Sequence, residues 1–199
     1  ANNYNNIKVP LRFKILNSKF PFDIKAKTLH KINKLNMLNC NDAEYSKLVN
    51  YIDNLCKIPL GVYKGLNLKM NNSSSEEISN FLTNFYSILN KNVYGHYKSK
   101  DQLIRIIAQW ISNPDLKGNV IGIQGFPGTG KTLLVKEGLS QALDLPFVFI
   151  PLGGLSDNSY LTGHSYTYEG STHGKLVNCL MDVKCMNPII YFDELDKVS

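Results

Sequence analysis

A glycine-rich stretch of this sequence, residues 124–132, has the residue spacing that binds phosphate groups. It reads QGFPGTGKT, in which Gly125, Gly130, Lys131 and Thr132 complete the pattern GxxxxGK[ST]. Glycines let successive backbone N–H groups turn inward around an anion, and the helix that follows presents its positive N-terminal end to the same anion. We therefore expect Lys131 to reach the β- and γ-phosphates of a nucleotide and Thr132 to ligate Mg²⁺.

The elements on either side must place this loop between a strand and a helix. Four apolar or small residues, 120–123, predict a short buried strand before it, and an apolar stripe over residues 130–143 predicts a helix after it. The alternative is an ordinary strand-to-helix turn, and both flanks argue against it. The loop residues predicted to contact the nucleotide are Gly125, Phe126, Pro127, Gly128, Thr129, Gly130, Lys131 and Thr132.

A second stretch, residues 189–194, would complete the chemistry. It reads IIYFDE, so four apolar residues predict a buried strand that delivers Asp193 and Glu194 to its carboxyl end, where ligands collect in open α/β sheets. Asp193 would hold the Mg²⁺ shell, and Glu194 would orient or deprotonate an attacking water. Glu194 and Lys131 are thus the catalytic candidates. The two motifs favour nucleotide hydrolysis over nucleoside-monophosphate kinase chemistry, because a kinase needs no water-activating carboxylate there.

Composition indicates a globular chain and excludes several classes. Of its 199 residues, 43% are hydrophobic, which suffices for a core. The sequence shows neither an apolar run of membrane-spanning length nor a signal peptide, so we expect a soluble, cytoplasmic protein without a membrane partner. The four cysteines lack metal-site spacing and are expected to be reduced thiols. The net charge of +6 comes from scattered lysines, so nucleic-acid binding stays possible without a supporting motif.

The region before the phosphate loop is predicted to be helical. Apolar residues recur at helical spacing after Asp23, Asp42, Ser74 and Ser99. Ser74 with Glu77 and Ser99 with Gln102 both have the spacing of a capping box. Residues 9–16 are expected to be extended or mixed, and the polar stretch 71–75 to be a linker. After the loop we expect a strand over 147–150, a long functional loop over 152–175 and a short helix over 176–183.

A Tyr-Gly turn lies between the third and fourth of these helices. Tyr94 and Gly95 could close over an adenine, and the alternative is a simple turn with a buried tyrosine. His96 is predicted to be a surface or capping histidine rather than a ligand.

With these residues laid out, residues 116–198 closely resemble the AAA+ module of the Lon protease family. The marks are LKG, GFPGTGKT, LGG at 152–154, GHSYTYEGS at 163–171 and YFDELDKVS. The segments YIDNLCKIPLG and VYGH resemble the region that precedes this module. The Asn- and Lys-rich composition and the stretch IIAQWISNP resemble divergent Lon-like ATPases of giant DNA viruses.

The resemblance implies roles at the matching positions. Tyr94 and Gly95 match the turn that lines the adenine pocket. Tyr168 matches the aromatic residue of the pore loop that grips a translocating polypeptide, where Glu169 replaces the family's usual aliphatic residue. Phe126 stands where the family usually has proline, and this leaves the phosphate-contacting pattern intact.

The expected fold class is α/β, an N-terminal helical region followed by the first part of a P-loop AAA+ parallel-sheet module. The predicted division is residues 1–75 as the helical region, 76–115 as a helical segment leading into the module, and 116–199 as the first half of the ATPase core. The resemblance implies ATP and Mg²⁺ as cofactors, a homo-oligomeric, hexameric ring in the full-length protein, and a polypeptide substrate that is unfolded or remodelled.

Two other functions stay open from the sequence. The chain could be the front half of a complete ATP-dependent protease whose Ser-Lys peptidase domain follows residue 199, or a nucleic-acid-linked AAA+ ATPase. The resemblance also implies that the sensor strand, the arginine finger and the helical lid follow residue 199. Because that strand would lie between the phosphate-loop strand and the Asp193 strand, residues 1–199 alone are not expected to be a working ATPase.

Overall fold

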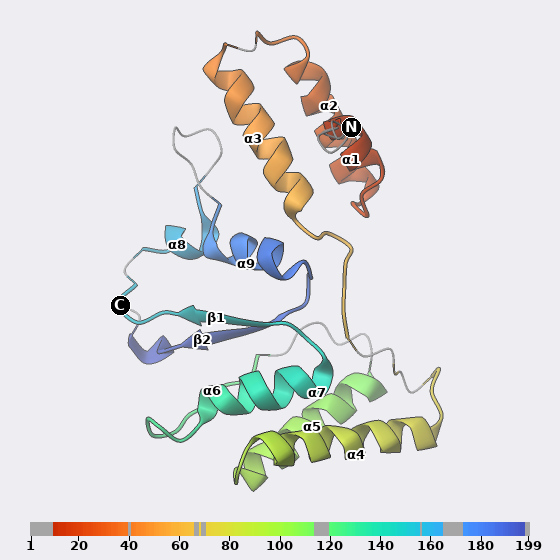
Figure 1. Ribbon diagram of the computed structural model, residues 1–199, viewed down its shortest axis with the longest axis vertical. Helices are drawn as coiled ribbons and strands as arrows, with labels where there is room; N and C mark the ends of the chain where they lie inside the picture. Colours follow the sequence, from red (N-terminus) through yellow and green to blue (C-terminus); the bar gives the residue numbers. More distant parts are fainter. Residues whose placement is uncertain are drawn as a thin grey trace, which may run out of the picture. The chain divides into compact units, whose positions relative to one another are not determined.

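A computed structural model describes residues 10–39, 41–65, 68, 71–113, 120–155, 157–164 and 173–197 (Figure 1). The chain divides into two compact units. The first comprises Ala1–Tyr63, Gly154–Met186 and Val198–Ser199, and the second comprises Lys64–Gly153 and Asn187–Lys197. We describe each unit by itself. The division at residues 75 and 115 stays a prediction.

The first unit contains five described helices. They are α1 (Leu11–Leu16), α2 (Phe22–Leu35), α3 (Ala43–Lys57), α8 (Ser159–Thr162) and α9 (Lys175–Val183). The helices α1, α2 and α3 pack around a common core to which Ile15, Ile32 and Ile52 contribute fully or almost fully buried side chains. Residues 9–16 were expected to be extended or mixed, whereas Leu11–Leu16 form a regular helix whose geometry turns Ile15 into this core. Asp23 lies in the first turn of α2, and Pro21 is the N-cap.

In the described part of the second unit, three longer helical segments pack around one core, and a short 3-10 helix, η2 (Leu195–Lys197), follows the last strand. The longer segments are α4 (Ser75–Asn92), α5 (Tyr97–Ser112) and a continuous helix made of α6 (Lys131–Leu133), the π-helix η1 (Leu134–Ser140) and α7 (Gln141–Leu143). Phe85, Leu103 and Leu134 are among the side chains that are buried in this core. The predicted helix over residues 130–143 is confirmed. Across the part of the chain that the structure describes, no helix combines the length and apolar composition needed to cross a membrane.

Two parallel strands lie beside these helices in the second unit. The strands β1 (Phe147–Pro151) and β2 (Ile189–Asp193) pair in register from Phe147 with Ile189 to Pro151 with Asp193 (Figure 1). Both strands were expected from their apolar runs. Together with the helical N-terminal region, the parallel pair confirms the predicted α/β class with an incomplete parallel sheet.

The predicted strand at residues 120–123 was wrong. These residues carry no strand, and Val120 is fully exposed. A strand forms where a neighbour takes up its backbone N–H and C=O groups. Among the described residues, strand pairing joins β1 to β2, and neither pairs with residues 120–123. The apolar run alone therefore did not suffice.

The two predicted capping boxes have different outcomes. At α4, the Ser74 hydroxyl accepts from the Glu77 N–H at 3.2 Å, and the Glu77 carboxylate accepts from the Ser74 N–H at 2.8 Å, which confirms the box. The box at Ser99 was wrong. Helix α5 starts two residues earlier, at Tyr97, because His96 in the left-handed conformation (φ 55°) turns the chain into the helix.

The confirmed capping box gives a stability test. Ser74→Ala removes the side-chain acceptor at the start of α4 and should lower the free energy of unfolding by about 1 kcal/mol in urea titrations. Ser75→Ala is the matched control, since Ser75 is an exposed first-turn residue of the same helix, and its effect should stay within about 0.5 kcal/mol. Equal effects of the two variants would contradict the capping assignment.

Candidate active site

The phosphate-binding pattern forms a tight loop that folds over its own lysine. The Lys131 Nζ donates to the carbonyl oxygens of Gly125 and Phe126, both at 2.9 Å, and the Thr129 hydroxyl donates to the Phe126 carbonyl at 2.8 Å. Gly128 (φ 75°) and Gly130 (φ 82°) have left-handed backbones that favour glycine. Both oxygens that hold the ammonium are neutral, so a charged phosphate would attract it more strongly.

The next residue, Thr132, faces strand β2. Its hydroxyl donates a long hydrogen bond of 3.4 Å to the Tyr191 hydroxyl. Side chains two positions apart on a strand project from the same face, so Asp193 shares the face of Tyr191 and lies roughly 6.6 Å further along β2. The Thr132 hydroxyl and the Asp193 carboxylate therefore belong to one side of the sheet. Both are hard oxygen donors of the kind that Mg²⁺ prefers, so the residues fit that ion.

Tyr191 was predicted only as an apolar strand residue. Its ring stacks on Phe149, the residue paired with it on β1, at a centroid distance of 6.0 Å, and lies 6.1 Å from the Phe147 ring. These contacts hold the ring while its hydroxyl meets Thr132. The available signal was a tyrosine hydroxyl in a run whose other side chains, Ile189, Ile190 and Phe192, have no polar group.

Glu194 lies just past the carboxyl ends of both strands. Its backbone is left-handed (φ 57°), and its side chain lies over Gly153, where an added Cβ would come within 2.1 Å of the carboxylate. Gly153 follows β1 by two residues, so its missing side chain makes room for Glu194. The carboxylate also pairs with Lys197 at 2.5 Å, and this hydrogen bond raises the pKa of Lys197. The Leu152 N–H donates a 2.9 Å hydrogen bond to the Asp193 carbonyl oxygen, which fixes the backbone at Asp193.

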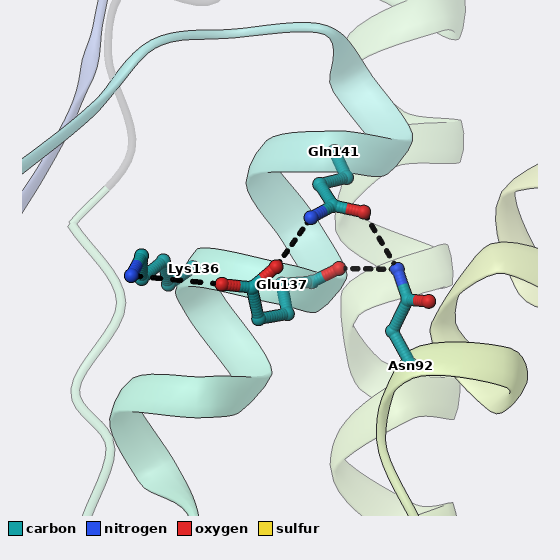
Figure 2. A network of polar contacts seen from close by, with 4 residues as sticks. All are labelled: Asn92, Lys136, Glu137 and Gln141. Carbon is teal, nitrogen blue, oxygen red and sulfur yellow. Dashed lines mark hydrogen bonds and ion pairs between the residues drawn. The ribbon is translucent and has the colours of Figure 1, made fainter.

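A polar network anchors the helix that follows the phosphate loop (Figure 2). The Asn92 amide, at the end of α4, donates to the Glu137 carbonyl at 2.7 Å and to the Gln141 side-chain oxygen at 2.8 Å. Gln141 in turn donates to the Glu137 carboxylate, which lies 3.6 Å from the Lys136 ammonium. Glu137 belongs to the π-helical stretch, whose altered backbone pairing is common beside functional sites.

The Tyr-Gly turn reaches the phosphate loop through His96, for which the sequence predicted no contact with the loop. Tyr94 is 95% exposed, so it is not the buried tyrosine of a simple turn. The His96 Nε2 lies 2.6 Å from the Thr129 carbonyl oxygen. His96 occupies the N-cap of α5, but its ring makes no cap bond there. The prediction of a surface or capping histidine therefore missed its contact, which joins residues 33 positions apart.

One end of this turn is held by a buried lysine. Lys100 is 1% exposed, and its ammonium donates to the Asn90 side-chain oxygen at 2.9 Å and to the Val93 carbonyl at 2.6 Å. Burial lowers the pKa of Lys100. Its partners are Asn90, in the last turn of α4, and Val93, the C-cap of that helix, so Lys100 fixes the chain immediately before Tyr94.

The predicted pore-loop residues Tyr168 and Glu169 lie outside the described residues. The structure does describe the base of that segment in the first unit. Gly163 and His173 form an antiparallel bridge there, and the Asn178 amide donates to the His173 carbonyl at 3.4 Å.

Comparison with known proteins identifies relatives over most of this chain. Residues 121–199 match the model of the ATPase family associated with various cellular activities (AAA). A "Lon protease homolog" of Acanthamoeba polyphaga mimivirus is 39% identical over 173 residues, which are 84% of this chain and 16% of that protein. The "Lon protease" proteins of Malacoplasma penetrans and Clostridioides difficile are each 31% identical, over 95% and 94% of this chain and 22% of their own lengths. The chain thus spans about a fifth of the length of these curated relatives.

Asn92 provides a test of the anchoring network. Asn92→Ala removes two hydrogen bonds to the helix and leaves the half-buried Glu137 carbonyl without the Asn92 amide as a donor. The free energy of unfolding should therefore fall by about 1–2 kcal/mol. Lys136→Ala breaks only the exposed ion pair of the same network and should cost about 0.5 kcal/mol or less. Urea titration of both variants measures the difference. A loss at Lys136 as large as that at Asn92 would contradict the assigned roles.

Proposed function

This chain is a Lon-related member of the AAA ATPase family, and from that premise we propose that its second unit binds ATP with Mg²⁺ and hydrolyses it. One observation carries the proposal. The residue after the loop lysine, Thr132, contacts the same face of β2 from which Asp193 projects. The phosphate-binding and acidic motifs, about sixty residues apart in the chain, thereby converge on one place.

Each residue of the site has a proposed role. Lys131 exchanges its carbonyl partners for the β- and γ-phosphates, and the left-handed glycines let the loop backbone approach them. Thr132 and Asp193 would hold Mg²⁺, which neutralises charge on the phosphates when it is bound. Glu194 orients or deprotonates the attacking water. It must first release Lys197, its partner in this structure.

The base of the nucleotide is proposed to bind beside the Tyr-Gly turn. Tyr94 presents an almost fully exposed aromatic ring, and Gly95 has an open backbone with no atom within 4 Å of where a Cβ would be. The hydrogen bond from His96 to the loop keeps this turn next to the phosphate site. An aromatic ring and exposed backbone groups suit a flat, polar-edged base such as adenine.

We further propose that ATP hydrolysis drives the unfolding or remodelling of a polypeptide in a homo-oligomeric, hexameric ring. The match of Tyr168 to the aromatic residue of the pore loop supports the polypeptide substrate, although Glu169 departs from that loop's usual aliphatic residue. A second candidate is the ATPase part of an ATP-dependent protease, which the names of the related proteins favour. The sequence that follows residue 199 in the gene would distinguish the two, because only the protease needs a Ser-Lys peptidase domain.

The nucleotide proposal predicts opposite behaviour for two variants of the full-length protein. Lys131→Ala should abolish ATP binding, whereas Glu194→Gln should keep the Kd within about threefold and reduce turnover by about a hundredfold or more. Binding is measured with a fluorescent ATP analogue and turnover by phosphate release. Lys136→Ala, an exposed lysine on the same helix, should leave both unchanged. Turnover by Glu194→Gln at the parent rate would refute the catalytic assignment.

The pore-loop proposal predicts that substrate handling and hydrolysis separate. Tyr168→Ala in the full-length protein should leave basal ATPase within about twofold and remove substrate-stimulated unfolding of a fluorescent test protein. The reason is that the tyrosine side chain would contact the polypeptide substrate and take no part in ATP hydrolysis. Tyr160→Ala, a partly exposed tyrosine on α8 with no assigned role, is the control. Equal unfolding by the parent and Tyr168→Ala would make Tyr168 an ordinary loop tyrosine.

A further inference from the structure

We propose that His96 is a positioning residue for the nucleotide's phosphates. Its ring holds the Thr129 carbonyl and thereby fixes the direction in which the Gly130 N–H points. This inference rests on the proposed nucleotide site and deepens it. His96 follows the Tyr-Gly turn in the segment VYGH, and it belongs to neither the phosphate loop nor the acidic motif from which the site was predicted.

The contact itself defines the chemistry of the ring. The Nε2 atom lies 2.6 Å from the Thr129 carbonyl oxygen, and a carbonyl can only accept. The ring therefore carries its proton on Nε2, as the neutral Nε2–H tautomer or as the imidazolium. In both forms, His96 donates to the loop backbone.

The geometry of the peptide bond links this contact to the direction of the Gly130 N–H. Thr129 C=O and Gly130 N–H belong to one planar, trans peptide unit, in which the two groups point in opposite directions. Holding the carbonyl toward His96 thus directs the N–H away from it. In the described part of the chain this N–H donates to no backbone or side-chain acceptor, and it stands at the N-terminus of the loop's helix, where free N–H groups bind anions.

The backbone of the turn indicates that the placement is specific. His96 adopts φ 55° and ψ 33°, a left-handed conformation that costs a non-glycine residue energy and often marks a functional position. The ring does not use this position to cap its own helix, and it lies over Gly130, where an added Cβ would be 3.8 Å from Nε2. Lys100 holds Val93 at the other side of the turn, so the ring is presented from a fixed base.

Two substitutions separate the ring's hydrogen bond from the strained backbone. Asparagine tolerates the left-handed conformation, but its amide is too short to replace Nε2. Glutamine tolerates that backbone less well, but its amide reaches about as far as Nε2 and can donate to the carbonyl. If His96 orients the loop, nucleotide affinity should depend on whether the side chain can reach the Thr129 carbonyl with a donor, and not on how well the residue tolerates the left-handed backbone.

We would measure the Kd of a fluorescent ADP and the KM and kcat for ATP in the full-length protein, with melting temperatures alongside. His96→Asn should raise Kd and KM about tenfold with kcat within about threefold, because the Gly130 N–H contacts phosphate before and during reaction. His96→Gln should keep all three values within about threefold of the parent.

The outcomes are distinguishable. A parent protein that binds no ADP overturns the proposed nucleotide site itself. A parent that binds ADP while His96→Asn binds it equally well overturns only the role of His96. Equal losses of affinity in both variants, accompanied by a lowered melting temperature, would also overturn it, because the ring would then act through the fold alone.

Discussion

The packing of the helix after the phosphate loop against α4 is the interaction on which the second unit depends. Leu134, Val135 and Leu139 are buried in that core together with Phe85 and Leu89. Burying a large apolar side chain contributes about 1.5–3 kcal/mol, so this face dominates the local energetics. Gly138 permits the close approach, since a Cβ there would lie 2.9 Å from Leu89. With the helix fixed, Lys131 and Thr132 at its first turn are fixed as well.

Local features of the fold and the site could be predicted from the sequence. The phosphate loop, the acidic pair at the end of β2 and the capping box at Ser74 depend on residues within a few positions of one another. The apolar runs of β1 and β2 were also sufficient to predict these strands, because the two strands pair with each other. Each of these features is determined by neighbours that the linear spacing already shows.

Features that depend on distant partners could not be predicted in this way. Residues 120–123 have the composition of a strand, yet strand formation needs a paired neighbour that no local pattern supplies. The contacts of His96 with Thr129 and of Tyr191 with Thr132 join residues 33 and 59 positions apart. Helix α5 starts at Tyr97 rather than at the predicted Ser99, because the left-handed backbone of His96 begins the helix before the Ser99–Gln102 spacing is reached.

The loop's conformation therefore rests on side-chain contacts more than on the sheet. A two-stranded sheet is marginal by itself, and the segment leading into the loop has no strand pairing among the described residues. The described contacts that shape the loop come instead from Lys131, Thr129 and His96, all directed at its carbonyl oxygens. Engaging the carbonyls leaves N–H groups as the exposed face of the loop, since each peptide presents one group to either side. The contacts of Thr129 and His96 need not break when Lys131 leaves its carbonyl partners for a phosphate, so they hold donors ready for an anion and reduce the cost of ordering the loop on binding.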